Sequence, residues 1–310
     1  MEPTHFNLPG GHRLGFEPIE VEGADDEQAL HMRLNWRPAI DTGDGTSHTI
    51  HPGMLTAFLD TLCGITTRFS FGDQPMITAT LELGVELLDM PERTDSVVGK
   101  AQCVHASPSA AHLAGEVMAG DIVVARGSGV FSLGPQRPGN TMDLAGMFAD
   151  MPSSFAGFEN EPNGFRDFLG YRFDGARGHL SGGDHLIGNP IIRAYHGGLS
   201  ASLLACTAED LVAASDRGEG FAFLSQHTHY LLPTSADAPM HADGRIIKLG
   251  KRYATVAVSA WQDDAEVQTS IVTLKRADSG WLRQSETTLP LVGCHRSVRL
   301  PRSAVKHREC

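Results

Sequence analysis

The sequence predicts an α+β protein made of two similar units in tandem, each a long α-helix wrapped by an antiparallel β-sheet, paired as an internal pseudo-dimer. The first observation is a repeat: HPGMLTAFLD at residues 51–60 returns as HGGLSASLLA at residues 196–205, an offset of 196 − 51 = 145. The second is that this offset aligns roughly eighty residues without a gap, one apolar helix and the strand patterns after it. A helix followed by several strands is typical of an α+β unit.

The first unit is expected at residues 1–135. Its helix is predicted at 53–70, where apolar residues recur at helical spacing up to the turn FGDQP. Alternating and β-branched runs then predict four strands. They are expected at about 77–88, 96–106, 109–118 and 121–133, with further strand sequence upstream near 14–36.

The second unit is expected at residues 166–276, with a helix at 198–215 and upstream strand sequence near 168–188. Its later strands are predicted at about 222–232, 242–250, 253–262 and 266–275. A Pro- and Gly-rich linker, 136–165, joins the units and holds a short helix around 141–150. Residues 277–310 are expected to form a C-terminal tail.

Composition and charge narrow the class of protein. The 310 residues carry a formal net charge of −12, which argues against a general nucleic-acid or anionic-membrane binder. No signal-peptide pattern and no apolar run of membrane-spanning length are present, so we expect a cytoplasmic protein. The five widely spaced cysteines predict neither a disulfide framework nor a zinc site. His227 and His229 share a strand face without an evident third ligand, so no metal is predicted.

The two repeated stretches resemble the signature of hot-dog thioesterases, in the branch of the phenylacetate-pathway and 4-hydroxybenzoyl-CoA enzymes. That signature is His-Gly-Gly, six residues, then Asp or Glu. The first unit matches with His51, Gly53 and Asp60, and Pro52 replaces the first Gly. The second matches with His196, Gly197 and Gly198, and Ala205 stands at the acid position.

The resemblance implies hydrolysis of an acyl-CoA or related thioester without a cofactor other than the CoA carried by the substrate. Backbone N–H groups at a helix start are unsatisfied donors that stabilise a developing oxyanion, and a carboxylate acts as general base or nucleophile. Asp60 lies seven residues beyond Gly53, about 10 Å along the helix axis, which is too far to serve its own helix start. In several relatives the acid of one hot-dog unit serves the helix start of its partner, so the resemblance implies that Asp60 serves the helix start at Gly197/Gly198, with His196 beside it.

Further residues are predicted to bind substrate or to assist. Gly53 and His51 mark the reciprocal helix start, which faces Ala205 and is expected to be inactive. The resemblance also implies oxyanion help from Asn189, a helper hydroxyl at Thr78, and contact between CoA phosphates and a basic hairpin holding Lys248, Lys251 and Arg252. Glu209, one turn after Ala205, is an alternative acid.

Two other functions stay open. One is a non-catalytic acyl-CoA binding or sensing protein, which the missing second acid suggests. The other is a hot-dog enoyl-CoA hydratase or dehydratase, for which no His–acid motif is found. A further homo-oligomer of the double unit is compatible with either reading.

Overall fold

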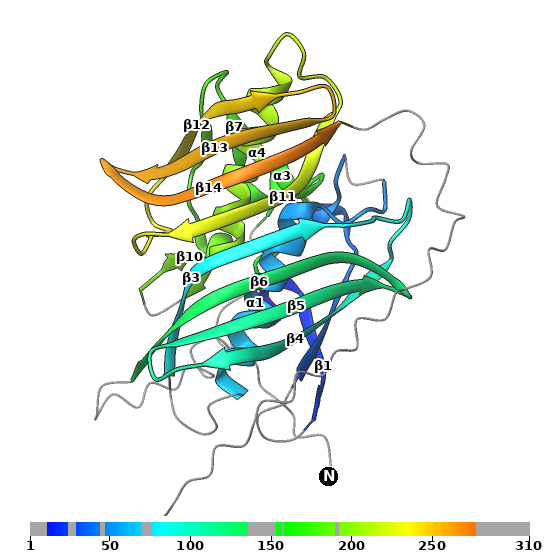
Figure 1. The fold of residues 1–310 in the computed structure, drawn as a ribbon, viewed down its shortest axis with the longest axis vertical. Coiled ribbons are helices and arrows are strands. Elements are labelled where there is room, and N and C mark those ends of the chain that lie inside the picture. The colour runs from blue at the N-terminus through cyan, green and yellow to red at the C-terminus, as the bar shows by residue number, and fades with distance from the viewer. Residues whose placement is uncertain are drawn as a thin grey trace, which may run out of the picture. The chain divides into compact units, whose positions relative to one another are not determined.

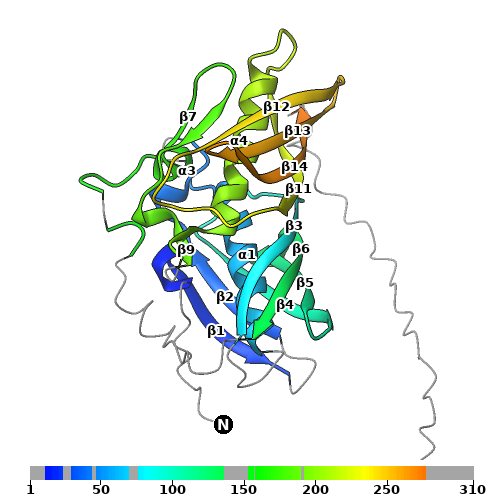
Figure 2. The ribbon, with the colours of Figure 1, turned by 90° about the vertical axis from the view of Figure 1, so that its left-hand side faces the viewer.

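A computed structural model of the chain describes residues 11–23, 29–43, 47–69, 76–135, 153–156, 158–189 and 192–276, all within one compact unit, Met1–Arg276. Two long helices, α1 (Pro52–Phe69) and α4 (Gly197–Ala213), lie on one side of a large antiparallel sheet (Figures 1 and 2). The α+β class predicted from the repeat is confirmed. The predicted tail 277–310 and the predicted helix at 141–150 lie outside the described residues, and the domain boundaries stay predictions.

The strands of the first half agree with their predicted positions to within one or two residues. They are β1 (Phe16–Glu22), β2 (Ala29–Asn35), β3 (Met76–Leu87), β4 (Ser96–Ala106), β5 (Ala110–Ala119) and β6 (Ile122–Pro135). The second half repeats the pattern with β11 (Phe221–Tyr230), β12 (Met240–Leu249), β13 (Tyr253–Gln262) and β14 (Ala265–Arg276).

The segment before α4 is more broken than predicted. It contains a short helix, α3 (Phe165–Leu169), and four short strands, β7 (Tyr171–Phe173), β8 (Gly178–Leu180), β9 (Ile187–Asn189) and β10 (Ala194–Tyr195). Among the described residues no helix is both long and apolar enough to cross a membrane.

One sheet of twelve strands runs through both halves in the order β1-β2-β4-β5-β6-β3-β11-β14-β13-β12-β8-β7. β3 and β11 pair antiparallel at its centre, with Val85 opposite Gln226. The two helices therefore share one continuous support.

The helices pack closely against each other because their contact face carries small residues. A Cβ added to Gly198 of α4 would lie 2.4 Å from the Cα of Ala57 of α1, so the two backbones almost touch. The opposite face of α1 buries Met54, Phe58 and Leu62 in the hydrophobic core. Asp60 is buried as well, which brings a carboxylate into the helix–helix interface rather than into water.

Candidate active site

Asp60 of α1 reaches the start of α4. The backbone N–H of Gly198 donates a hydrogen bond to Asp60 Oδ2 at 2.9 Å, across 138 residues of sequence. A Cβ on Gly197 would lie 2.8 Å from the same oxygen, so only glycine leaves the carboxylate this room. The N-terminus of a helix favours a negative charge through its unpaired N–H groups and its dipole. The acid of one half thus meets the helix start of the other, as the repeat predicts.

His196 and Thr80 hold this arrangement in place. His196 caps α4, and its Nδ1 accepts a second hydrogen bond from the Gly198 N–H at 3.2 Å. Its Nε2 lies 2.7 Å from Thr61 Oγ1. Burial lowers the pKa of His196, an effect that the Asp60 carboxylate opposes, so the ring is neutral at pH 7. Thr80 Oγ1 donates to Asp60 Oδ1 at 2.8 Å, and both carboxylate oxygens therefore have fixed donors.

A buried polar chain supports the first turn of α4 from the sheet side. Tyr230 Oη donates to Gly197 O at 3.0 Å, and Ser200 Oγ donates to the same carbonyl at 2.8 Å. Gln268 Nε2 in turn donates to Ser200 Oγ at 2.6 Å, and Gln268 lies opposite Tyr230 on the neighbouring strand. Burial, and then the charge of Asp60, raise the pKa of Tyr230 well above its usual range, so Tyr230 stays a donor.

A pocket of about 420 Å³ opens beside Asp60 and the α4 start. This volume is within the range of small-molecule sites. Its polar wall includes Asp60, His196 and Gln268. Apolar side chains from both halves line the remainder: Ile65, Leu81, Phe131, Ile192, Leu231 and Leu232.

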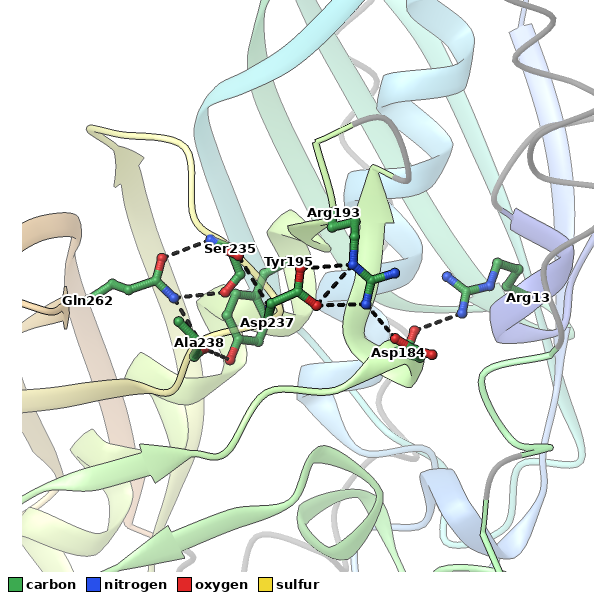
Figure 3. A network of polar contacts seen from close by, with 8 residues as sticks. All are labelled: Arg13, Asp184, Arg193, Tyr195, Ser235, Asp237, Ala238 and Gln262. Carbon is green, nitrogen blue, oxygen red and sulfur yellow. Dashed lines mark hydrogen bonds and ion pairs between the residues drawn. The ribbon is translucent and has the colours of Figure 1, made fainter.

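A polar network fixes one wall of this pocket (Figure 3). Arg193 pairs with both Asp184 and Asp237, with closest distances of 2.6 Å. Arg13, which is buried, donates to the backbone carbonyls of Asp184 and Ile187. These bonds connect the β9–β10 segment to the N-terminal segment and to the loop after β11. The β9–β10 segment contributes Asn189 and Ile192 to the pocket lining.

The reciprocal helix start, at Gly53, is closed. Phe165 stacks on His51 with ring centroids 4.5 Å apart, and a Cβ on Gly53 would lie 2.4 Å from Phe165 Cε1. The Gly53 N–H donates to His51 Nδ1 at 2.9 Å. His51 and Gly53, which are predicted to bind substrate, therefore lie directly against the Phe165 ring of α3, and their role stays a prediction.

Glu209, the predicted alternative acid, is held by fixed donors. It accepts from Arg166 Nη2 at 2.9 Å and from the backbone N–H of Phe223 at 3.0 Å. Arg166 donates to Asp210 as well, at 2.8 Å. Ligand atoms of Glu209, His51 and Cys206 lie within 4.8 Å of one another, so Glu209 belongs to the surroundings of the Gly53 helix start. Its role as an alternative acid there stays a prediction.

The basic hairpin is not near the pocket. Tyr230 and Gln268 mark the pocket end of the strands, whereas Tyr253 pairs with Lys275 at the other end. The seven residues from 268 to 275 span about 23 Å. Lys248, Lys251 and Arg252 surround this distant β12–β13 turn, and their contact with CoA phosphates stays a prediction.

Of the predicted residues, the structure groups Asp60, Gly197, Gly198, His196, Asn189 and Thr78 around one pocket. The bond to Asp60 comes from Thr80, two residues beyond the predicted helper Thr78. The register of β3 shifts between Thr80 and Glu82, so alternation along that strand does not continue past Thr80. Tyr230 and Gln268 were missed. The available signal for them was polar side chains at inward-facing strand positions, where Gln226, Thr228 and Gln268 are all buried.

Comparison with known proteins agrees with this geometry. Residues 188–275 match the family model described as the acyl-CoA thioesterase N-terminal domain. The matched range contains the His196-Gly-Gly start of α4 together with Tyr230 and Gln268. No curated protein matches the chain at a significant level.

Solved structures share the fold over most of the chain. The tesB protein of Mycobacterium avium subsp. paratuberculosis has a TM-score of 0.56 at 12% identity, covering 84% of this chain and 96% of its own. A conserved hot-dog protein from Alicyclobacillus acidocaldarius has a TM-score of 0.52 at 12% identity, with 89% and 99% covered. The 12:0-ACP thioesterase of Umbellularia californica has a TM-score of 0.52 at 8% identity, with 80% and 94% covered.

The fold is thus the hot-dog fold, and residues 188–275 match an acyl-CoA thioesterase domain. The predicted resemblance to hot-dog thioesterases and the predicted enzyme class, hydrolysis of a thioester, are confirmed. The phenylacetate and 4-hydroxybenzoyl-CoA branch stays a prediction.

Proposed function

We propose that this protein hydrolyses an acyl-CoA ester, with Asp60 as general base or nucleophile and the helix start at Gly197/Gly198 as the oxyanion site. The observation that carries the proposal is the 2.9 Å hydrogen bond from the Gly198 N–H to Asp60 Oδ2. It brings a buried carboxylate and an oxyanion donor within one bond of each other at the edge of a substrate-sized pocket.

In the proposed reaction, the carbonyl oxygen of the thioester takes the place of Asp60 Oδ2 as acceptor at the helix start. Preorganised donors of this kind are worth roughly 3–4 kcal/mol in the transition state. The released Oδ2 then either takes a proton from water as that water attacks the carbonyl carbon, or attacks the carbon itself. In both routes the C–S bond breaks and the thiolate leaves. In the second route water then cleaves the acyl–Asp60 anhydride.

The neighbouring residues act on this reaction through Asp60 and the helix start. Thr80 holds Asp60 Oδ1 and so fixes the direction of the other oxygen. The neutral His196 ring accepts at Nδ1 and therefore directs its Nε2 proton to Thr61 Oγ1, which makes it a positioning residue.

The pocket walls favour an apolar acyl group. Six apolar side chains line the pocket beyond Asp60, and Ile192, Leu231 and Leu232 are each about half exposed at its rim. An acyl group that buries these side chains gains binding free energy from the hydrophobic effect. CoA is proposed as the thiol carrier, and acyl carrier protein is the other carrier to test. A cytoplasmic location and a further homo-oligomer stay predictions.

A panel of aliphatic and aromatic thioesters on CoA and on acyl carrier protein, assayed for free thiol, tests the proposal. We expect hydrolysis of at least one member, a loss of at least roughly 100-fold in kcat for Asp60→Asn, and nearly full activity for Glu209→Gln. Asn can still accept from the Gly198 N–H and donate to Thr80, so the fold is kept while the charge is lost.

Full activity in Asp60→Asn would refute the mechanism. A loss confined to Glu209→Gln would move the acid to the second half. Tight binding of the panel without any hydrolysis would favour the non-catalytic acyl-CoA binder.

A further inference from the structure

Three potential metal ligands meet on the outer face of the sheet, away from the helices. His227 Nε2 lies 3.4 Å from Glu82 Oε2, and His229 Nδ1 lies 3.5 Å from Glu82 Oε1. The two imidazole rings stack with centroids 5.0 Å apart. One ligand atom from each of the three side chains lies within 4.8 Å of the others. Sequence reasoning found only the two histidines, because the third group comes from 145 residues earlier in the chain.

The backbone explains why these side chains converge. β3 and β11 pair antiparallel, with His229 directly opposite Glu82 and His227 opposite Gly84. Residues 227 and 229 point to the same face, since side chains alternate along a strand. Gly84 has no side chain to occupy the space beside His227. Both histidines and Glu82 are about half exposed, so an ion from solvent reaches them without rearrangement.

The spacing fits a tetrahedral ion. Metal–ligand bonds of about 2.0–2.1 Å at tetrahedral angles put neighbouring ligand atoms about 3.3 Å apart. The two histidine–glutamate distances, 3.4 Å to Glu82 Oε2 and 3.5 Å to Glu82 Oε1, are each close to this value, and one ligand atom from each of the three side chains lies within 4.8 Å of the others. Two imidazoles and one carboxylate form a ligand set that zinc uses, with a fourth position left to water. Mg²⁺ prefers an octahedral oxygen shell and fits this set poorly.

We propose that Glu82, His227 and His229 form a surface site for a divalent transition-metal ion of the Zn²⁺ class. The site bridges the two halves of the molecule, because Glu82 belongs to the first unit and both histidines belong to the second. β3 and β11 are the central pair of the sheet, so a bound ion links the two halves where their strands meet. The site is separate from the Asp60 pocket and does not depend on the proposed function.

The second group with metal-ligand spacing among the described residues is His51, Cys206 and Glu209. Its carboxylate is already bound by Arg166 and by the Phe223 N–H, so its oxygens are committed. It is therefore the weaker candidate, and the test separates the two groups.

Isothermal titration calorimetry with ZnCl₂, on full-length protein stripped with a chelator, tests the proposal. We expect the double variant His227→Ala/His229→Ala to bind one Zn²⁺ fewer per chain than the wild type. Glu82→Gln is expected to weaken that equivalent at least tenfold. His105→Ala is the matched control, since His105 and His112 also pair on an exposed face, at 6.0 Å, but belong to no three-ligand group among the described residues.

Thermal unfolding provides the second readout. At a Zn²⁺ concentration 100-fold above its Kd, the Tm of the wild type is expected to rise by roughly 5 °C and that of the double variant to stay unchanged. Mg²⁺ is expected to leave both unchanged. Equal Zn²⁺ stoichiometry and equal affinity in the wild type and the double variant would overturn the proposal. So would the absence of any Zn²⁺ binding to the wild type.

Discussion

Replacing Gly198 with alanine tests how closely α1 and α4 must approach for the site to exist. The new Cβ would lie 2.4 Å from Ala57 Cα and 2.7 Å from Thr56 O, both backbone atoms that cannot rotate away. Ordinary contact begins at 3.4 Å, so the helices must separate by 3.4 − 2.4 = 1.0 Å. The same shift lengthens the 2.9 Å bond from Gly198 N to Asp60 Oδ2 beyond hydrogen-bond range.

Overpacking costs about 1–3 kcal/mol, and a lost bond to a charged group about 1.5–3 kcal/mol. We therefore expect Gly198→Ala to lose about 2.5–6 kcal/mol of unfolding free energy, which lowers the Tm by roughly 5–24 °C. A 1 Å misplacement of catalytic groups is expected to reduce kcat/KM roughly 100-fold.

Differential scanning calorimetry and the free-thiol assay measure both effects. Gly64→Ala is the stability control, because its Cβ would lie 3.4 Å from the Phe131 ring, an ordinary contact with a side chain. Its Tm is expected to stay near that of the wild type. A Gly198→Ala protein with wild-type Tm and wild-type kcat/KM would refute the close-approach reasoning.

Three further predictions follow from the same contacts. Thr80→Val removes the 2.8 Å hydrogen bond to Asp60 Oδ1 and is expected to lower kcat roughly 10- to 100-fold in the thiol assay. Thr78→Val is expected to leave kcat unchanged. A larger loss of kcat in Thr78→Val than in Thr80→Val would contradict this assignment. Arg166→Met removes the cation that pairs with Glu209 and Asp210. We expect it to lower the unfolding free energy by about 2–3 kcal/mol in urea, less than for a fully buried pair because the guanidinium is partly exposed. An unchanged urea midpoint would count against this role. Burial lowers the pKa of His51 to about 3, so its neutral form contributes stability that is complete above pH 6.5 and is lost as the pH falls toward 3. The unfolding free energy should therefore fall by up to about 1.4 kcal/mol per pH unit in that window, and less steeply in His51→Asn; equal slopes would contradict the assignment.

The repeat predicted the parts of the fold that local patterns control. Helices α1 and α4 and the eight longer strands after them lie within two residues of their predicted positions, because apolar periodicity and turn residues decide these elements. The cross-unit meeting of Asp60 and Gly198 was also predicted, from the resemblance to hot-dog thioesterases together with the distance of Asp60 from its own helix start.

Other features depend on tertiary placement that local sequence does not encode. Phe165 closes the Gly53 helix start from a segment read as linker, and no pattern around His51 announces it. The basic hairpin was placed by analogy, whereas the register of β13 on β14 puts Arg252 at the far end of the strands from Gln268. Thr78 and Thr80 point to the same face of β3 because side chains alternate, so the sequence pattern does not decide which of the two reaches Asp60.

The central claim is that each chain has one site, built from the acid of the first half and the helix start of the second. The most direct test is a calorimetric titration of the full-length protein. The titrant is a non-hydrolysable thioether analogue of an acyl-CoA that the protein hydrolyses. We expect one analogue bound per chain, and none in Gly64→Trp, which places a large ring in the pocket beside Asp60. Two analogues per chain, or binding that persists in Gly64→Trp, would contradict the claim.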